Sequence, residues 1–462
     1  MSEVLPKPAG GLAHGRSVRP DELTLSQETI LMPKATYERL RADIASIPVI
    51  DCHEHTTGPA NAPQYKDPLG ALIQGYVQSD LQSAATDAEM SVVNSDKPLE
   101  ERWRVFENIW KRTEHTAYAR VTKWVLREFY GERTLTFDAL KRIEGKLLNL
   151  KDEKVYWGIL DKAGIRCRLL NIWVGDRKII EGTHVLPERD RYLIPLPSYH
   201  GVRCWDDANN HTRIIDRTAT SLEEYLDVCR EVFTRLKKRG AVGMKDQSAY
   251  GRTLHYENAT RHDAERLFNF IMEDPRRSVG WPEAKPLDDY LFHSFMRIAR
   301  DLDLPVQVHT GLLAGVRNDI AKTNAVHFTS VLELHRDVRF DLFHGNWPYA
   351  GEWLYLGKNY PNVALDCCWV HIIDPIYSEN VLVEAVTTVP HGKIHGFGGD
   401  YGDSIEYAAG HLEVARDNIA HALTRLIERG WIGPDEARGI AADWLFNNPN
   451  RFFKLGFEPV SV

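Results

Sequence analysis

Short uninterrupted apolar runs recur along the chain, and segments with helical periodicity separate most of them. Each run has the length of a β-strand, and several end abruptly in polar residues. Parallel strands that are buried on both faces appear as continuous apolar runs, because helices cover one face and a core fills the other. The eight candidate strands are residues 47–55, 165–173, 191–198, 241–246, 305–311, 338–345, 362–369 and 393–400.

This alternation of strand and helix patterns predicts an α/β fold built from parallel βα units. Eight units favour a closed (β/α)8 TIM barrel, and an open doubly wound sheet is the alternative. Residues 56–164 are too long for a single βα connection, and they carry helical periodicity with many aromatic residues. We therefore predict a helical insertion after the first strand, lying over one end of the barrel. A separate helical domain is the alternative, although no Gly/Ser- or Pro-rich linker marks a boundary.

The remaining segments complete the predicted organisation. Residues 1–30 are rich in Gly, Pro and charge, which predicts a flexible N-terminal arm. Residues 31–462 are predicted to form the barrel together with its insertion. Within this range the polar segment 205–220 is predicted to be a loop, and residues 404–455 are predicted to be mostly amphipathic helix.

Composition and charge exclude some classes of function. Apolar residues make up 43% of the chain and charged residues 26%, as in ordinary globular proteins. The net charge of −8 argues against a nucleic-acid-binding surface, which is usually basic. The N-terminus lacks the apolar core of a secretion signal, and no run approaches the roughly 18 apolar residues of a membrane-spanning helix.

The six cysteines show no CxxC spacing, which favours free thiols in a reducing compartment over a disulfide framework. We therefore expect a cytoplasmic protein that acts on a small-molecule substrate and contacts neither nucleic acid nor a membrane. The sequence leaves open whether the chain forms a homo-oligomer.

The polar residues at the ends of the apolar runs are of metal-binding types. Residues two apart on a strand point to the same side, so His53 and His55 both face the barrel mouth while Glu54 points away. Three further strand ends, the fifth, sixth and eighth, carry His309, His344 and Asp400. Active sites of (β/α)8 barrels lie at these carboxyl ends. Each motif alone also fits a core histidine or a turn, but the combination favours a metal site.

Imidazole and carboxylate ligands suit a divalent cation, above all Zn²⁺, with Mn²⁺ or another ion as alternatives. Lys245 ends the fourth predicted strand, where a buried amine is costly unless it is paired or modified. Carbamylation would turn this lysine into an anionic bridge to a second metal ion. The other interpretations are a charge that reaches solvent at the barrel rim and an ion pair with Asp246. We expect one ion rather than two, and the role of Lys245 stays open.

The HxH motif of the first strand, with the later histidines and the final aspartate, resembles the amidohydrolase superfamily of metal-dependent barrels over residues 49–455. The stretches VQVHTGLLAG and FDLFHGNWPYAGEWLYLGKNYPNVALD are similar to its amidohydrolase-related branch, which includes a domain fused to glutamine-synthetase-like proteins. The closing WLFNNPNRFFKL resembles the final helix of that branch.

The helical insertion, with its Trp-rich ERWRVFENIWKRTEHTAYARVTKWVL, is similar in placement to that of uronate isomerases. QVHTGLLAGVRND also resembles the uronate isomerase stretch that carries a metal-binding histidine and a downstream arginine. The final strand departs from that pattern, because uronate isomerases follow its aspartate with a Ser-Arg-rich run, whereas this chain reads GGDYGDSIEY.

The resemblance implies roles for individual residues. The residues that would bind or border the metal are His53, His55, His309 and Asp400. His344 would hydrogen-bond the substrate or the metal-bound water. Arg317 would clamp a substrate carboxylate, unless it is a solvated loop charge. Trp347 and Tyr349 would form a wall of the pocket, unless they serve only in packing.

The first functional hypothesis is hydrolysis of a small, carboxylate-bearing substrate through a metal-activated water. Asp400 would take the water proton and deliver it to the leaving group, while His344 would stabilise the oxyanion. The alternatives are a uronate isomerase-like aldose–ketose isomerisation and a metal-dependent decarboxylation of an aromatic acid. The fourth hypothesis is a barrel that binds a ligand without chemistry, against which the intact set of metal-binding residues argues.

Overall fold

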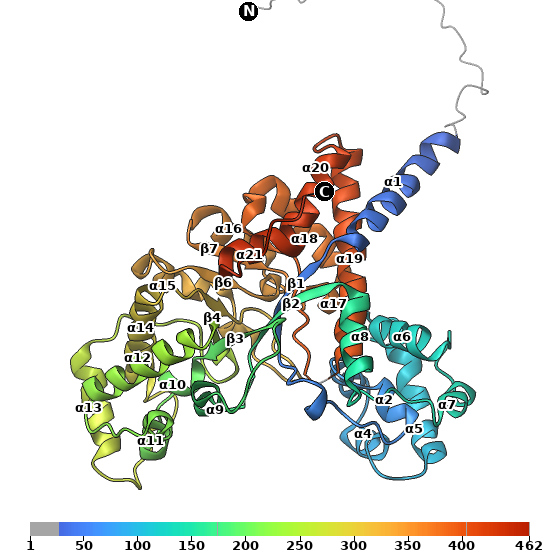
Figure 1. Cartoon of the computed structure of the whole chain (residues 1–462). Coiled ribbons are helices and arrows are strands. Elements are labelled where there is room, and N and C mark those ends of the chain that lie inside the picture. The colour runs from blue at the N-terminus through green and yellow to red at the C-terminus, as the bar shows by residue number, and fades with distance from the viewer. Residues whose placement is uncertain (1–26, 173, 403, 462) are drawn as a thin grey trace, which may run out of the picture.

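The computed structural model describes residues 27–172, 174–402 and 404–461 (Figure 1). Most of the predicted N-terminal arm therefore lies outside the described residues, and helix α1 begins at Gln27. The division into an arm and one barrel domain over 31–462 stays a prediction. No helix within the described ranges is both long and apolar enough to cross a membrane.

Eight parallel strands form one sheet in the order β1 to β8, each pairing with the next in sequence. The strands are β1 Val49–Glu54, β2 Ile165–Leu170, β3 Asp190–Pro195, β4 Ala241–Asp246, β5 Val306–Val308, β6 Phe340–Leu342, β7 Val363–Asp366 and β8 Ile394–His395. Each one lies within or overlaps a run that the apolar pattern predicts. The chain after β8 also pairs with β1, because Cys52 N donates to Phe397 O at 3.0 Å and Asp400 N donates to His53 O at 2.8 Å. These bonds draw the sheet into a barrel and confirm the TIM-barrel prediction over the doubly wound sheet.

Helices surround the barrel and follow its strands in sequence. Those outside the insertion are α1 Gln27–Ser46, α8 Glu153–Ala163, α9 Asp176–Glu181, α10 Pro197–His200, α11 Trp205–Thr212, α12 Leu222–Lys238, α13 Arg261–Met272, α14 Lys285–Asp301, α15 Thr329–Leu334, α16 Ala350–Asn359, α17 Val370–Ile373, α18 Pro375–Thr388, α19 Ile405–Glu428, α20 Pro434–Ala442 and α21 Asn448–Phe453. The predicted C-terminal helical region is therefore present as α19 to α21.

The predicted helical insertion is also present, but it ends with α7, because α8, inside the predicted range 56–164, packs against β2 and α19 as a helix of the barrel. The helices of the insertion are α2 Pro68–Leu72, α3 Val77–Ala84, α4 Asp87–Val93, α5 Leu99–Thr113, α6 Ala117–Tyr130 and α7 Phe137–Ile143. They form a lobe beside the long helix α19 (Figure 1). The apolar core of this lobe includes Phe343, Trp369 and Tyr401, which follow β6, β7 and the end of β8. The insertion therefore packs over the carboxyl ends of the barrel strands.

Helix α6 shows how local sequence signals place the lobe. The Thr116 hydroxyl caps its start by accepting the Ala119 N–H, and Gly131 ends it in a left-handed conformation with φ of 73°. The helix then packs against α19, where a Cβ atom at Gly410 would lie 2.9 Å from the Trp124 ring. Gly410 is therefore required for the close approach of the two helices.

One secondary-structure prediction is wrong. The polar segment 205–220 is not a loop throughout, because its first half forms α11. The Asp207 carboxylate accepts the N–H groups of Arg203 at 2.8 Å and Cys204 at 3.1 Å, and this cap stabilises the start of the helix. Ala208 and His211 on the same helix are buried, so tertiary packing overrides the polar composition.

Candidate functional site

Three of the predicted metal ligands meet at the closure of the barrel. His53 lies within β1, His55 lies one residue beyond it, and Asp400 lies in the segment that pairs with β1. His55 Nε2 is 3.1 Å from Asp400 Oδ1, and His53 Nε2 is 3.6 Å from the same oxygen. His344, two residues after β6, approaches from the other side, with its Nε2 3.7 Å from Asp400 Oδ2. The structure therefore brings these four side chains together around one carboxylate.

His309 lies at the edge of this group. Its Nδ1 is 3.2 Å from His344 Nε2, while its Nε2 is 2.8 Å from the carbonyl oxygen of Leu312. A ligand role for His309 would therefore use Nδ1. His344 and Asp400 both adopt left-handed backbone conformations, with φ of 63° and 58°. Such conformations are uncommon for residues other than glycine and persist only where the surrounding contacts enforce them.

The imidazole rings are oriented by contacts on their second nitrogen. These contacts are His53 Nδ1 to Gln307 Oε1 at 3.1 Å, His55 Nδ1 to Asn171 O at 2.7 Å, and His344 Nδ1 to Cys368 O at 2.9 Å. Metal-binding histidines are usually held in this way, because the outer contact sets both the tautomer and the ring orientation.

The protonation states also suit a cation. Burial lowers the pKa of His53 and His309 well below the usual value, and it lowers the pKa of His344 to about 4. Burial alone would raise the pKa of Asp400, but the hydrogen bond from His55 and the neighbouring histidines lower it. Neutral imidazoles and an ionised carboxylate are the forms that bind a divalent ion. His53 Nε2 is buried and has no hydrogen-bond partner among the described residues, so the site fits a metal.

The glycines of the GGD sequence allow Asp400 to reach β1. A Cβ atom at Gly399 would lie 1.9 Å from Glu54 Oε1, which leaves no room for any other residue. The Gly399 N–H donates to Asp51 Oδ1 at 3.0 Å, and the Tyr401 N–H donates to Glu54 Oε2 at 2.9 Å. The buried acids of β1 therefore hold the segment on both sides of Asp400.

A cavity of about 260 Å³ opens onto these residues. Its lining residues are His53, His55, Tyr76, Lys245, Gln247, Tyr250, His309, Ala314 and Asp400. Tyr76 comes from the insertion, where its hydroxyl donates to the backbone oxygen of Asp400 and its ring stacks on Trp369 at 4.4 Å. The insertion therefore contributes directly to the site.

Lys245 lies inside the barrel and not at its rim. The side chain is 1% exposed, and Nζ lies 3.5 Å from the centre of the Phe343 ring. Nζ has no hydrogen-bond partner within the described part of the chain. Both the solvated charge and the ion pair with Asp246 are therefore wrong as interpretations of Lys245. Burial lowers the pKa of this lysine to about 8, although nearby acids such as Asp400 oppose the shift.

Three predicted substrate-binding residues do not line the cavity. Arg317 is exposed, and its Nη2 lies 3.5 Å from Asp87 Oδ1 in the insertion. Trp347 packs against the main apolar core, and Tyr349 is half-buried, with its backbone oxygen accepting from Asn346 Nδ2 at 3.0 Å. Their roles in substrate binding stay predictions.

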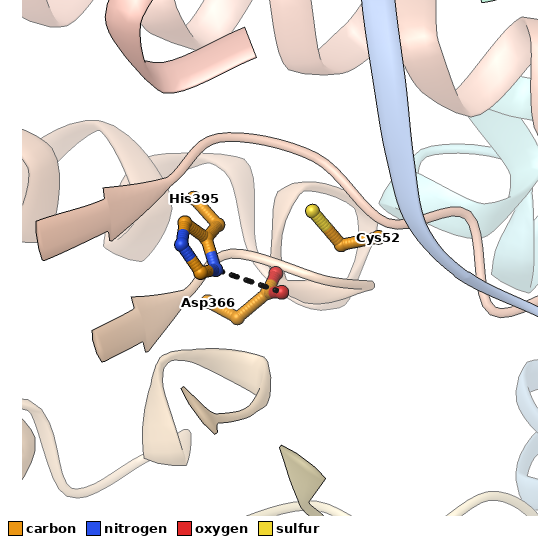
Figure 2. A group of neighbouring side chains, drawn as sticks. All are labelled: Cys52, Asp366 and His395. Atoms are coloured by element: carbon orange, nitrogen blue, oxygen red, sulfur yellow. Dashed lines mark ion pairs between the residues drawn. The ribbon is translucent and has the colours of Figure 1, made fainter. Parts of the chain in front are cut away.

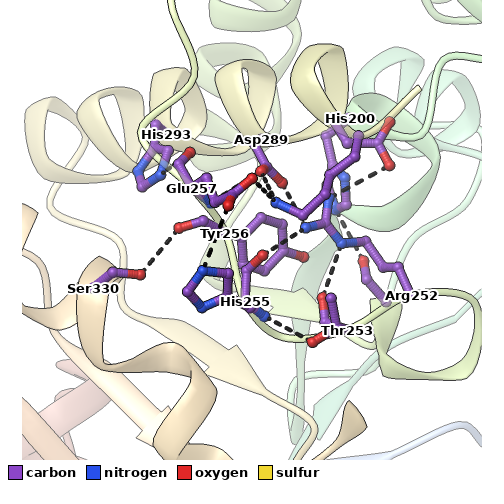
Figure 3. A network of polar contacts seen from close by, with 12 residues as sticks. His200, Arg252, Thr253, His255, Tyr256, Glu257, Asp289, His293 and Ser330 are labelled. Atoms are coloured by element: carbon purple, nitrogen blue, oxygen red, sulfur yellow. Dashed lines mark hydrogen bonds and ion pairs between the residues drawn. The ribbon is translucent and has the colours of Figure 1, made fainter. Parts of the chain in front are cut away.

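A buried polar network supports the loop after β4, which brings Gln247 and Tyr250 to the cavity. His200 Nε2 lies 3.3 Å from Asp246 Oδ1, and the Tyr256 hydroxyl donates to Asp246 Oδ2 at 2.9 Å. The Arg252 guanidinium stacks on the Tyr256 ring at 3.9 Å and donates to Asp289 at 2.5 Å (Figure 3). These contacts hold both ends of the loop.

The sequence prediction missed Tyr76, Gln247 and Tyr250. The last two directly follow the fourth predicted strand, so the same strand-end argument that selects Lys245 could have found them. Tyr76 lies in the insertion, where no strand end or motif marks it.

Comparisons with known proteins agree with this arrangement. The family model described as Amidohydrolase matches residues 252–454. Protein fluG of Emericella nidulans is 30% identical over 233 residues, which cover 48% of this chain and 26% of that protein. The matched region thus spans about a quarter of the length of that curated relative.

Solved structures share the fold at low sequence identity. The glucuronate isomerase of Caulobacter crescentus is 18% identical, with a TM-score of 0.72 over 96% of this chain and 98% of that one. The uronate isomerase of Thermotoga maritima is 12% identical, with a TM-score of 0.73 over 91% and 97%. A protein assigned as a metal-dependent hydrolase from Lactobacillus casei is 16% identical, with a TM-score of 0.62 over 90% and 97%. These likenesses extend over the barrel and the insertion together.

Proposed function

We propose that this chain, whose residues 252–454 match the Amidohydrolase family model, is a member of the amidohydrolase superfamily and a metal-dependent hydrolase of a small, carboxylate-bearing substrate. Membership of that superfamily would imply an enzyme that uses a divalent metal ion. The observation that supports the proposal best is the convergence of His53, His55 and His344 on the Asp400 carboxylate beside a cavity of about 260 Å³.

In this proposal His53, His55 and Asp400 would hold the metal, and His309 would contribute through Nδ1. A bound divalent ion, Zn²⁺ or Mn²⁺, supplies Lewis acidity and lowers the pKa of water at the site. Asp400 is ionised and lies at the cavity wall, so it can accept a proton from water and return that proton to the leaving group. Because Cys368 O accepts the Nδ1–H of the neutral His344 ring, Nε2 presents a lone pair, and His344 would accept a hydrogen bond from the water or the substrate at the site.

In this proposal Lys245 binds the carboxylate of the substrate. It is the one lysine or arginine among the described residues that line the cavity, whereas Arg317 points toward the insertion. An ammonium group in this buried position would pair with a substrate carboxylate. The carbamylated form would carry the opposite charge and would bind a second metal ion instead. NMR of protein equilibrated with ¹³C-labelled bicarbonate distinguishes the two states, because only a carbamate gives a protein-bound ¹³C signal.

The experiment is a substrate screen on metal-loaded wild type and Asp400→Asn. N-acyl amino acids and small carboxylate esters are tested as substrates, and the carboxylic acid product of their hydrolysis is measured. We expect hydrolysis by wild type, and a loss of at least about 100-fold in kcat in the variant, since general acid–base catalysis contributes that much or more. Metal content is measured in both proteins. Full activity in Asp400→Asn with its metal retained would show that the carboxylate does not move the proton.

The second candidate function is aldose–ketose isomerisation of a uronate sugar. It is favoured by the likeness to the glucuronate isomerase fold over 96% of the chain and by the presence of Tyr76 from the insertion in the cavity. Glucuronate and galacturonate are therefore included in the same screen, with ketose formation as the signal. Ketose without acid release from any amide or ester would replace the hydrolase proposal by this one.

A further inference from the structure

A second group of metal-binding side chains lies in the barrel interior. Cys52 of β1, Asp366 of β7 and His395 of β8 point toward one another (Figure 2), and each offers a ligand atom within 4.8 Å of the other two. Asp341 of β6 joins them, because His395 Nδ1 is 2.9 Å from Asp341 Oδ1 and 3.7 Å from Asp366 Oδ2. We call these four residues the interior cluster.

The interior cluster is closed to solvent. Each of its four side chains is at most 1% exposed. Asp341 Oδ1, Asp366 Oδ2 and His395 Nδ1 contact one another as ion pairs, and none of these three atoms has a hydrogen bond to any other group within the described chain. Two carboxylates thus share one imidazole in the absence of solvent, and burying both acids is costly unless a proton or a cation neutralises the second one.

The geometry points to a structural metal site, and we propose that the interior cluster binds a thiophilic divalent cation such as Zn²⁺, separately from the ion at Asp400. Thiolate, imidazole and carboxylate are the ligands that zinc prefers, and four protein ligands without an open position are typical of structural sites. Tetrahedral bonds of about 2.0–2.3 Å place ligand atoms about 3.3–3.8 Å apart. The separation of 3.7 Å between His395 and Asp366 lies in that range, the 2.9 Å to Asp341 is that of a direct ion pair, and Cys52 Sγ, within 4.8 Å of both His395 and Asp366, would move toward a bound ion.

The position of the cluster suggests what the ion would do. Its ligands come from β1, β6, β7 and β8, the strands that close the barrel and lead to His53, His344 and Asp400. Gln307 connects the two sites, since it contacts His53 through Oε1 and donates to Asp341 Oδ2 at 3.3 Å. A cation held by the interior cluster would therefore fix the strands that present the catalytic residues.

The test is cobalt substitution of metal-depleted protein. A cysteine ligand gives a thiolate-to-Co²⁺ charge-transfer absorption in the near ultraviolet, whereas imidazole and carboxylate ligands give none. We expect wild type to take up two ions per chain and to show this absorption. Cys52→Ser is expected to lose the absorption and one of the two ions, since the serine hydroxyl is a poor ligand.

Two control variants make the result specific. Cys167→Ser changes another fully buried thiol, on the adjacent strand β2 and outside the interior cluster, and is expected to keep both ions and the absorption. Cys368→Ser removes the thiol that lies near His344 and Asp400, and is expected to behave like Cys167→Ser. Absence of the absorption in wild type, or its loss in Cys368→Ser and not in Cys52→Ser, would overturn the proposal.

Anomalous diffraction from cobalt-loaded wild-type crystals gives an answer that needs no variant. A peak between Cys52 Sγ and His395 Nδ1 supports the interior site, and a map with its only peak at Asp400 refutes it. A peak at the interior cluster and none at Asp400 would keep this inference and instead contradict the proposed catalytic metal.

Discussion

Replacement of Lys245 by methionine should stabilise the metal-free protein at neutral pH. The amine is 1% exposed, its Nζ has no hydrogen-bond partner in the described ranges, and burial lowers its pKa from 10.5 to about 8. A charge that the folded state disfavours lowers the free energy of unfolding. Methionine has a similar length and flexibility without the charge, so Lys245→Met removes this penalty with little change in packing.

The size of the effect follows from the shift. The difference between 10.5 and about 8 corresponds to about 3 kcal/mol at about 1.4 kcal/mol per pKa unit. The contact of Nζ with the Phe343 ring offsets roughly 1–2 kcal/mol of that penalty. We therefore expect Lys245→Met to be more stable than wild type by about 1–2 kcal/mol at pH 7.

The pH dependence has a definite sign. Below pH 8 the lysine is charged in both the folded and unfolded states, so the full penalty is present. Between pH 8 and 10.5 the folded protein loses the proton before the unfolded chain does, and the stability of wild type rises relative to the variant. The advantage of Lys245→Met should therefore decrease across this interval.

The assay is urea unfolding of chelator-treated proteins, free of bicarbonate, at several values between pH 7 and 10.5. Other groups titrate in this range, but they are common to both proteins and cancel in the difference. The exposed Lys151→Met serves as the surface control. If the difference between wild type and Lys245→Met stays constant with pH, or if wild type is the more stable at pH 7, the argument from charge burial is wrong.

Three further predictions test the supporting structure. Gln307→Leu should weaken metal binding about 10–100-fold in a chelator competition, because it removes the contact that orients His53; unchanged affinity would mean that the contact is dispensable. Burial raises the pKa of Glu406 to about 7 from 4.5, so ionisation of this carboxyl progressively destabilises the fold between those values. Glu406→Gln should accordingly gain up to about 3 kcal/mol at pH 8 and nothing at pH 4 in denaturant titrations, and an equal gain at both would refute this. Arg168→Met should cost about 3–5 kcal/mol of unfolding free energy, because it leaves the buried Asp190 unpaired; a loss below 1 kcal/mol in urea unfolding would contradict it.

The barrel could be predicted because its strands are buried on both faces. Burial of this kind demands continuous apolar runs, and β4 and β7 lie entirely within such runs. The register at the closure could not be predicted, since it depends on backbone bonds between β1 and the chain beyond β8. Helix α11 was missed for a related reason: a side-chain cap and tertiary packing outweigh its polar composition, and neither is visible in a periodicity.

The same distinction applies to the candidate site: residues placed by strand geometry could be predicted, and a residue placed by a loop could not. His53 and His55 could be placed because strand geometry dictates where alternate side chains point, and parallel strands end at one face. Arg317 could not, because it lies in a loop whose backbone, with φ of 63° at this residue, turns the side chain toward the insertion. Sequence proximity to His309 therefore carried no information about direction.

The deepest residues of the site depend on conformations that local sequence disfavours. His344 and Asp400 are left-handed, and such a conformation costs an ordinary residue roughly 1–2 kcal/mol. Nothing in the sequences FHG or GGD requires that cost. Contacts with distant elements stabilise the left-handed conformations. These contacts are the bond from Asp400 N to His53 O and the bond between His344 Nδ1 and Cys368 O. Strand-end reasoning thus selects the correct residues at these positions, while the three-dimensional contacts decide that their side chains meet.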